Sequence, residues 1–409
     1  MQPANANLTL VGADRDTGLA TPSGFHENTT LQSLVSPVSD AEFRAQYWET
    51  KPLIIHRGRP DYYGDLFTLQ DFDGTVRRSN GYVKTAEATT KKATRHHGVS
   101  PSALERVLTD MSDGATLILD SVHQYNAKLA QMCRMLGQET GFYYQTNIYL
   151  TPPNGKGFSP HWDNHDVFIM QVLGRKHWKV EKQRRTLPAK DANIEEEGRD
   201  LRGEIYEFTL EQGDTVYIPR GFVHAAECGS DSSMHVTLGI HPYTWDELLH
   251  AAIKAAVMGD DSLRLSLPIG YHKAGDTGIV SRIEEAMRKA GDPAFLAQVL
   301  EQYRDEVVQK APLDITGQIP SFYQPKPLSL DDRIGARAGL YYTIRPHAES
   351  VTLNVGTRTI TFPDFFGEAL KFALEKPGFA IRDLPGDLED EEKIVFIERL
   401  MQEALIVRI

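Results

Sequence analysis

The sequence has few cysteines, no long apolar run and no excess of positive charge, and each of these absences excludes a class of protein. Its 409 residues include only the two cysteines Cys133 and Cys228, too few for the disulfide framework of a secreted domain. No apolar run approaches the roughly 18 residues that span a bilayer. The N-terminal residues also lack the basic and apolar regions of a signal peptide. We therefore expect a cytoplasmic protein without a membrane segment.

The formal net charge of -12 argues against nucleic acid as a general partner, because phosphate binding depends on clustered Lys and Arg. An acidic surface favours a basic protein partner, although solubility alone also explains such a charge. A chain of 409 residues exceeds the usual size of one domain, so we expect two or three.

The centre of the chain carries the triplet His161-Trp162-Asp163 between two apolar segments that predict strands. In a strand, residues i and i+2 point to the same face, so the His161 imidazole and the Asp163 carboxylate are expected to reach one metal ion. These two groups supply two-thirds of a facial triad, which leaves positions open on non-haem Fe(II). A third ligand is needed.

His165 has the same parity as His161, but on an extended strand the two residues lie about 13 Å apart. Bonds from a metal ion to imidazole are about 2 Å long, so the third ligand must come from another strand. The strongest candidate is His224, which follows the apolar run 216–218 and the turn 219–221. A lone histidine there would be interpreted as a core or turn residue, but the HxD triplet favours metal binding.

The segments 147–180, 213–228 and 232–241 together resemble the JmjC-type Fe(II)/2-oxoglutarate oxygenases. They are most similar to the ribosomal-oxygenase branch, whose members hydroxylate a histidine or arginine side chain in ribosomal proteins. The ordered motifs extend from residue 144 to 245 and are far more specific than HxD alone. The resemblance implies an α+β protein with a double-stranded β-helix (jelly-roll or cupin) core that uses Fe(II), 2-oxoglutarate and O2.

Asn147 and Tyr149 share one face of a predicted strand, with residues 148 and 150 on the other. They either form a polar core network or hold 2-oxoglutarate, and the resemblance favours the second role. A co-substrate with a distal carboxylate needs a fixed cation, and a turn predicted at 174–176 offers Arg175 and Lys176. Alignment to the family pattern G-[ER]-K-x-W selects Lys176 and leaves Arg175 as an exposed neighbour.

Two further polar residues, His235 and Thr237, alternate on a later predicted strand. They either line the co-substrate pocket or complete the barrel. Three other histidines are interpreted as structural or exposed: His177, His241 and His250. Outside the central motifs, the sequence predicts helices at 40–50, 101–111 and 127–136, the last ending at Gly137, and strands at 52–56 and 116–119. It also predicts solvated charged segments at 91–97 and 182–200; for the basic segment 91–97, contact with substrate or a phosphate is the alternative.

The chain divides into four predicted regions. Residues 1–30 are a poorly ordered leader, and 31–245 form the JmjC catalytic domain. Residues 246–311 show apolar positions three and four apart, which predict one-sided helices, and the resemblance implies that they form a homodimer. Residues 312–409 comprise a proline-containing linker and, by resemblance, a winged-helix-like module. The acidic start of its second helix argues against DNA recognition.

The expected function is an Fe(II)/2-oxoglutarate-dependent peptidyl hydroxylase. As the resemblance implies, His161, Asp163 and His224 hold iron, while Lys176, Asn147, Tyr149, His235 and Thr237 surround 2-oxoglutarate. The first candidate target is the β-carbon of a histidine in a ribosomal protein or a ribosomally synthesised precursor peptide. Arginine hydroxylation, methyl-lysine demethylation and a non-catalytic cupin that only binds its partner remain the alternatives.

Overall fold

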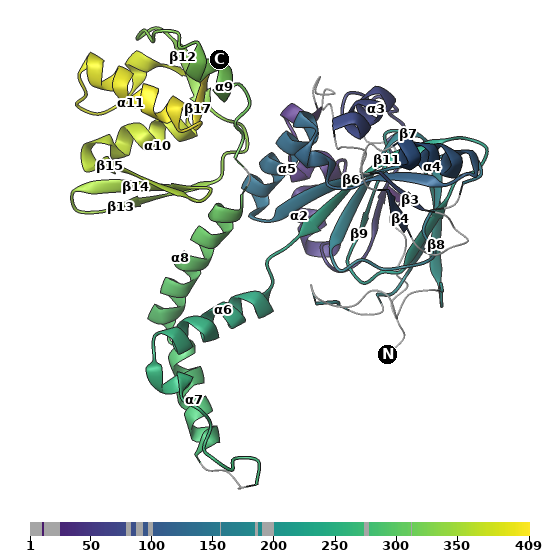
Figure 1. Cartoon of the computed structure of the whole chain (residues 1–409), viewed down its shortest axis with the longest axis horizontal. Helices are drawn as coiled ribbons and strands as arrows, with labels where there is room; N and C mark the ends of the chain where they lie inside the picture. The colour runs from purple at the N-terminus through teal and green to yellow at the C-terminus, as the bar shows by residue number, and fades with distance from the viewer. Residues whose placement is uncertain are drawn as a thin grey trace. The chain divides into compact units, whose positions relative to one another are not determined.

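The computed structural model describes residues 10–11, 25–78, 83–86, 93–96, 101–155, 157–184, 187–189, 200–273, 278–311 and 313–409. The chain forms two compact units, Met1–Pro242 and Tyr243–Ile409, and the colour ramp in Figure 1 separates them. Most of the predicted leader and of the charged segment 182–200 lies outside the described residues. In the other charged segment, 91–97, the prediction of a solvated loop was wrong, because Ala93–His96 form a strand that pairs with Val83–Ala86. No helix among those described is both long and apolar enough to cross a membrane.

The first unit is built on one large sheet that folds over itself. Its strands run in the order β1-β2-β9-β7-β11-β6-β5-β3-β4, and β8 and β10 pair with β7 off this path. The strands are β1 (Leu10–Val11), β2 (Leu53–Ile55), β3 (Val83–Ala86), β4 (Ala93–His96), β5 (Thr116–Leu119), β6 (Tyr143–Thr151), β7 (Asp166–Glu181), β8 (Ile205–Glu211), β9 (Thr215–Ile218), β10 (His224–Glu227) and β11 (Ser233–His241).

Strand β7 belongs to both halves of this barrel. Its first half pairs with β9 and β11, whereas its second half, from Arg175 onward, pairs with β8 and β10. The change occurs at Gly174, which has φ +61° and lies beside an irregularity in the ladder with β11. The predicted turn at 174–176 was therefore wrong, because the chain bends there without leaving the strand. A side chain at Gly174 would collide with the backbone oxygen of Ser232.

Two hydrophobic cores lie on opposite faces of the large sheet. Val167 and Ile169 point into the barrel, where they pack against Trp178 of the smaller half, while Phe168 and Met170 point outward onto the helices. Alternation along β7 is the period-2 pattern of a strand that is covered on both faces. The inner face is the one that can build a site.

The helices of the first unit cover the outer face of the sheet (Figure 1). They are α1 (Leu31–Val35), α2 (Asp40–Gln46), α3 (Leu69–Arg78), α4 (Pro101–Ser112) and α5 (Ala127–Thr140). Helix α5 passes through the predicted stop at Gly137 and ends at Gly141, whose φ of 78° supplies the left-handed C-cap. The unit also extends into the predicted leader, because Leu10–Val11 pair with β2 and Phe25 is buried in the outer core, both before the predicted boundary at residue 31.

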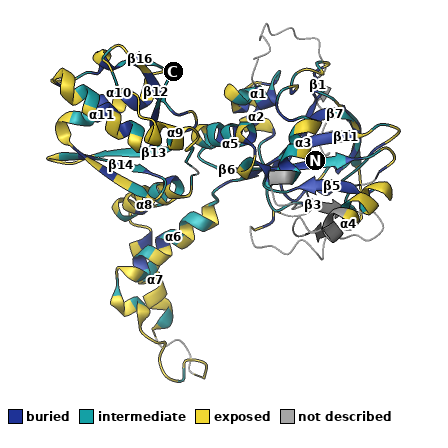
Figure 2. Ribbon diagram, turned by 45° about the horizontal axis from the view of Figure 1, so that its top comes forward, coloured by how far each residue is buried: buried dark blue, intermediate teal, exposed yellow. Residues whose placement is uncertain are grey.

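The second unit begins with three helices in the region for which the sequence predicted them. They are α6 (Trp245–Met258), α7 (Ile279–Ala290) and α8 (Pro293–Lys310). Many of their residues are exposed, as Figure 2 shows, and these include large apolar side chains such as Trp245 and Ile283. An exposed apolar stripe on a helix is unusual for a surface that faces only water.

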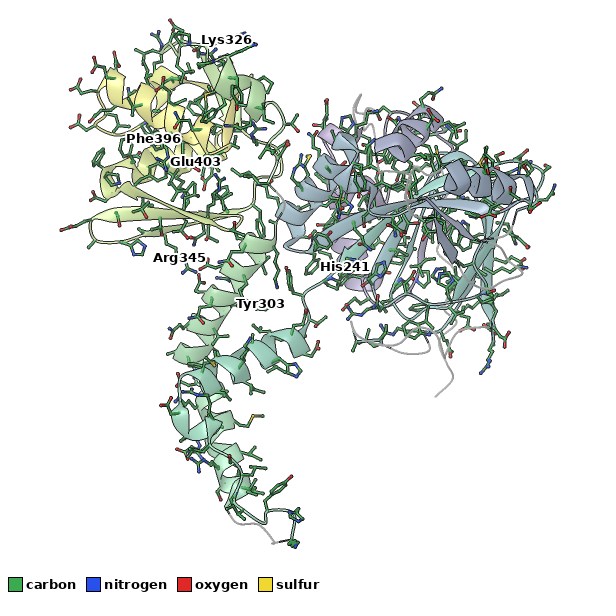
Figure 3. The ribbon with its side chains drawn as sticks, viewed as in Figure 1. His241, Tyr303, Lys326, Arg345, Phe396 and Glu403 are labelled. Carbon is green, nitrogen blue, oxygen red and sulfur yellow. The ribbon has the colours of Figure 1, made fainter. Side chains whose placement is uncertain are left out.

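The C-terminal part contains two three-stranded sheets, β16-β12-β17 and β13-β14-β15. The strands are β12 (Arg333–Ala336), β13 (Tyr342–Pro346), β14 (Ser350–Val355), β15 (Arg358–Pro363), β16 (Phe379–Ala380) and β17 (Ile406–Arg408), with helices α9 (Gln318–Tyr323), α10 (Gly367–Glu375) and α11 (Asp390–Gln402). Phe396 of α11 lies in their shared core, and Figure 3 labels it together with Arg345 of β13. The proline-containing linker prediction missed α9.

Candidate metal and co-substrate site

Three ligand-type side chains meet at one end of the barrel. His161, Asp163 and His224 each offer an atom such that all three atoms lie within 4.8 Å of one another. The Asp163 carboxylate oxygens are 4.0 Å from His161 Nε2 and 3.6 Å from His224 Nε2. Two imidazoles and one carboxylate with an open side are the donor set of a facial-triad Fe(II) site.

The Nδ1 atoms of His161 and His224 form hydrogen bonds that fix the orientation of the two imidazole rings. His161 Nδ1 lies 3.0 Å from the carbonyl oxygen of Ser159, and His224 Nδ1 lies 3.0 Å from that of Phe222. A carbonyl oxygen can only accept, so both Nδ1–H groups donate and both Nε2 lone pairs face Asp163. Metal-binding histidines are commonly oriented in this way, and the arrangement fits a metal ion.

The triplet does not lie on a strand, so the strand parity predicted for it was wrong. His161 forms an isolated bridge with His224, in which each backbone N–H donates to the other residue's carbonyl oxygen, at 3.1 and 2.8 Å. The carbonyl oxygen of Asp163 accepts from the N–H of Gly221. Backbone hydrogen bonds from the loop of the triplet to Gly221 and to His224 at the start of β10, rather than alternation along one strand, bring the three side chains together.

Electrostatics prepare these groups in the protonation states that a metal needs. Burial alone would raise the pKa of Asp163, but the imidazoles of His161, His224 and His165 bring it below its ordinary value. Burial, with the neighbouring His161, lowers the pKa of His224 to about 4. The carboxylate is therefore ionised and the His224 imidazole neutral at physiological pH.

His165 stands apart from the three-residue cluster, as the sequence predicted, but for a different reason. Its ring stacks on that of His241 at a centroid distance of 4.7 Å, and its Nδ1 lies 3.1 Å from Asn164 Oδ1. The ring rests on Gly239, where any side chain would come within 3 Å of it. His165 is turned onto β11 and is close enough to influence Asp163 only through its charge.

The inner face of β6 and β11 carries the next group of predicted residues. Tyr149 is paired with His235, and Asn147 with Thr237, in the ladder between these strands. The rings of Tyr149 and His235 stack at 4.9 Å, and Asn147 Oδ1 accepts from the N–H of Ser121. Burial, and then the nearby Asp163 carboxylate, raise the pKa of Tyr149, which places this face next to the metal-type cluster.

Lys176 occupies the deep end of the same face. Its side chain is 3% exposed, and its Nζ donates to Thr151 Oγ1 at 2.9 Å. Burial lowers the pKa of the ammonium to about 8. Among the described residues, no carboxylate pairs with this cation, whereas Arg175 next to it is exposed and pairs with Asp231. A buried cation without a counter-charge is costly and is the feature expected where an anionic ligand binds.

Two buried ring nitrogens beside Lys176 point to the same conclusion. His235 Nδ1 and Trp178 Nε1 have no hydrogen-bond partner in the described part of the protein. The Trp178 ring lies 5.9 Å from Lys176 Nζ, and its centroid is 5.5 Å from that of His235. Buried polar groups are normally hydrogen-bonded, so an anchoring cation with two adjacent unpaired nitrogens fits a co-substrate that carries a carboxylate.

Several residues at this site were missed by the sequence reasoning. Thr151 continues the 147, 149, 151 series and Trp178 shares the parity of Lys176, so strand periodicity could have found both. Phe158 packs its ring edge-on against Tyr149 and His161, and Cys228 is a buried thiol near Lys176. Both residues come from loops, where no periodic pattern predicts the direction of a side chain. His177 pairs with Glu207 on a partly exposed face, which agrees with a structural role.

Comparison with known proteins identifies the class. A family model of the JmjC domain matches residues 121–248. Ribosomal oxygenase 1 from Gallus gallus is 32% identical over 294 residues, which cover 66% of this chain and 49% of that protein. The bifunctional lysine-specific demethylase and histidyl-hydroxylase NO66 from Aedes aegypti is 32% identical over 262 residues, 59% of this chain and 40% of that protein. The chain thus spans half or less of the length of these two relatives.

Solved structures establish the fold. An X-ray structure of E. coli ycfD superposes with a TM-score of 0.59 at 19% identity, over 91% of this chain and 98% of that one. A structure of YcfD, a ribosomal oxygenase from E. coli, in complex with cobalt and 2-oxoglutarate gives a TM-score of 0.53 at 17% identity, with the same coverage.

The barrel and the cluster of two histidines and one aspartate, together with the family match, define a JmjC-type cupin protein. Within that class the chain is ribosomal-oxygenase-like by its sequence similarity to ribosomal oxygenase 1 and NO66. The predicted family and the predicted cupin core are confirmed.

Proposed function

We propose that the protein is an Fe(II)- and 2-oxoglutarate-dependent hydroxylase that acts on a side chain of a peptide or protein. The observation that carries this proposal is the pairing, on one inner face of the barrel, of a three-ligand cluster with the buried, uncompensated ammonium of Lys176. The names of the relatives, which include ribosomal oxygenase and histidyl-hydroxylase, support a protein substrate and a histidine target.

His161, Asp163 and His224 would hold the iron through Nε2, a carboxylate oxygen and Nε2. When bound, the iron would activate O2 with electrons from 2-oxoglutarate, so that one oxygen atom would enter succinate, formed together with CO2, and the other would be added to the substrate carbon. Lys176 would bind the distal carboxylate of the co-substrate, and Tyr149, His235, Asn147 and Thr237 would line its pocket. The apolar walls of the barrel exclude water from this region.

The proposal is tested by mass spectrometry of histidine-containing ribosomal-protein segments, and of precursor peptides encoded nearby, incubated with Fe(II), ascorbate and 2-oxoglutarate. We expect a gain of one oxygen localised to the β-carbon of a histidine, and none with the His224→Ala variant. Oxygen added to arginine would show that the target residue is arginine instead of histidine, and loss of a methyl group from methyl-lysine would show that the protein is a demethylase. No peptide change and no succinate release with any candidate would favour a non-catalytic binding protein.

We also propose that α6 and α7 form a homodimer interface. Trp245, Leu249 and Ile283 expose 81%, 58% and 57% of their surface, and similar apolar side chains, Val280 and Met287, flank Ile283 on α7. Such faces are typical of a subunit interface. Light scattering across a dilution series at micromolar concentration should give the dimer mass. Ile283→Asp should shift it to the monomer, whereas the same change at the exposed polar residue Glu284 should not.

For the C-terminal part, we propose a winged-helix-like module that does not recognise DNA. The first turn of α11 contains Asp390, Glu391 and Glu392, and like charges repel phosphates. Mobility-shift titrations at low salt should show no binding to duplex DNA. We place the protein in the cytoplasm on the basis of its two buried free thiols, and cell fractionation tests this location.

A further inference from the structure

The Lys176 ammonium is held by a single side chain among the described residues. Thr151, the last residue of β6, is fully buried, and its Oγ1 lies 2.9 Å from Lys176 Nζ. An ammonium can only donate, so the Thr151 oxygen must accept. Its own proton is then free for a neighbour, and Thr116 Oγ1 of β5 lies 3.0 Å away.

The orientation of Thr151 is itself fixed by close packing. A side chain at Gly155 would come within 2.9 Å of the Thr151 methyl group, so the loop backbone lies directly against that methyl. The carbonyl oxygen of Gly155 accepts from the N–H of Cys228 at 2.9 Å, which ties this loop to the segment that follows β10. The side chain of Thr151 is thus held between β5 and the loop.

We propose that Thr151 is the positioning residue that fixes the Lys176 ammonium in the pocket and thereby sets which length of 2-oxo acid the site accepts. This inference rests on the proposed function and adds to it a residue that need not touch the reacting atoms. The physical reason is the flexibility of lysine, whose four-carbon stem leaves the charge free to move unless an acceptor holds it.

Removing the hydroxyl should therefore lower both the affinity for 2-oxoglutarate and the selectivity for it over longer 2-oxo acids. In Thr151→Val the shape of the side chain is kept but the ammonium loses its acceptor. Hydrogen bonds to a charged group are among the stronger ones, so affinity for 2-oxoglutarate should fall at least about tenfold. The preference for 2-oxoglutarate over 2-oxoadipate, which is one carbon longer, should also decrease because the cation can follow the longer acid.

The test measures binding without turnover. Titration calorimetry on the full chain loaded with Mn(II), which stands in for iron, gives affinities for 2-oxoglutarate and 2-oxoadipate. Thr151→Ser keeps the hydroxyl and should stay within about threefold of the wild type. Thr209→Val removes a threonine hydroxyl that faces His177 on β8 and should bind as the wild type does.

A second readout separates positioning from a general loss of structure. An ammonium without its acceptor is less stable, so the pH at which binding weakens should move down in Thr151→Val and return in Thr151→Ser. In turnover, the KM for 2-oxoglutarate should rise while kcat changes little. Mn(II) affinity should be unchanged.

Three results would overturn the inference. Thr151→Val could bind both acids as the wild type does while Lys176→Ala does not, which would show that Lys176 needs no positioning by this hydroxyl. Equal losses in the Ser and Val variants would assign the effect to packing. Failure of the Mn(II)-loaded wild type to bind 2-oxoglutarate at all would refute the proposed function, and this inference with it.

Discussion

The two ends of the barrel site differ in charge, in exposure and in how they are held. At the metal-type end, Asp163 is ionised, and the side chains of His161 and Asp163 are 32% and 25% exposed. At the other end, a cation is 3% exposed and has no counter-charge among the described residues. Backbone bridges hold the first end, whereas the second is held by one hydroxyl.

This difference fixes the direction in which a ligand with two unlike ends must enter. The end that carries a negative charge attracts a metal cation, and the sealed end that carries a positive charge accepts only an anion small enough to reach it. A 2-oxo acid with a distal carboxylate satisfies both ends when that carboxylate goes in first. The four predictions that follow test whether the two ends are as independent as their structures indicate.

The largest effect is expected at the metal end. His224→Ala removes one of three ligands, and since loss of an outer partner of a metal ligand alone costs roughly 10- to 100-fold, activity should fall by more than about a hundredfold. Metal content measured by plasma mass spectrometry should fall with it, while circular dichroism should be unchanged. Full activity in this variant would break the assignment of the cluster.

A smaller effect, confined to the co-substrate, is expected at the other end. Lys176→Ala should weaken 2-oxoglutarate binding by about 10- to 100-fold, the range for a hydrogen bond to a charged group, while Mn(II) affinity stays the same. Arg175→Ala is the matched control, because that guanidinium is exposed and paired with Asp231. Equal losses in both variants would mean that the cation was assigned to the wrong residue.

The affinity for 2-oxoglutarate should also depend on pH in one direction. Burial lowers the pKa of free Lys176 to about 8, so the ammonium is present below that pH and is lost above it. Binding should be constant from about pH 6.5 to 8 and then weaken by up to about tenfold per pH unit. Calorimetry across this range tests it, and the Lys176→Ala protein should show no such break. A rise in affinity above pH 8 would contradict a role for the charged form of Lys176.

The smallest effect is expected for His165→Ala. This ring lowers the pKa of Asp163 only as a neighbouring charge, and a partly exposed charge interaction contributes up to about 1 kcal/mol, or about fivefold. Mn(II) affinity should therefore remain within about fivefold of the wild type. A loss of metal binding comparable to that in His224→Ala would show that His165 is a metal ligand. It would contradict the distinction between the three-residue cluster and the stacked pair His165 and His241.

Much of the fold could be predicted because its signals are local. The run 116–119 is a strand with the predicted bounds, and the three helices after residue 244 follow their apolar spacing. The errors occurred where a distant contact decides the outcome. Helix α5 passes Gly137 because Gly141 supplies the cap, and Gly174 bends inside a strand because β11 remains paired with it.

The site shows the same division. Residues on regular strands, such as Tyr149 and His235, lie on the face that alternation predicted. His161 and Asp163 meet His224 through a bridge between a loop and the first residue of β10. No periodicity describes this contact, so the expected grouping occurs for a reason that the sequence did not contain. Cys228 and Phe158 reach the pocket from loops whose paths depend on the rest of the barrel.

Strand β7 begins three residues after Asp163 and carries Lys176 in its second half, past the bend at Gly174. One continuous segment therefore sets the spacing between the metal-type cluster and the Lys176 ammonium. Inserting or deleting a single residue between Asp163 and Lys176 would turn Lys176 to the opposite face of the sheet, however well the barrel still folded. Length variation in related chains should thus be found in connections such as the one between β7 and β8, and be excluded from this segment.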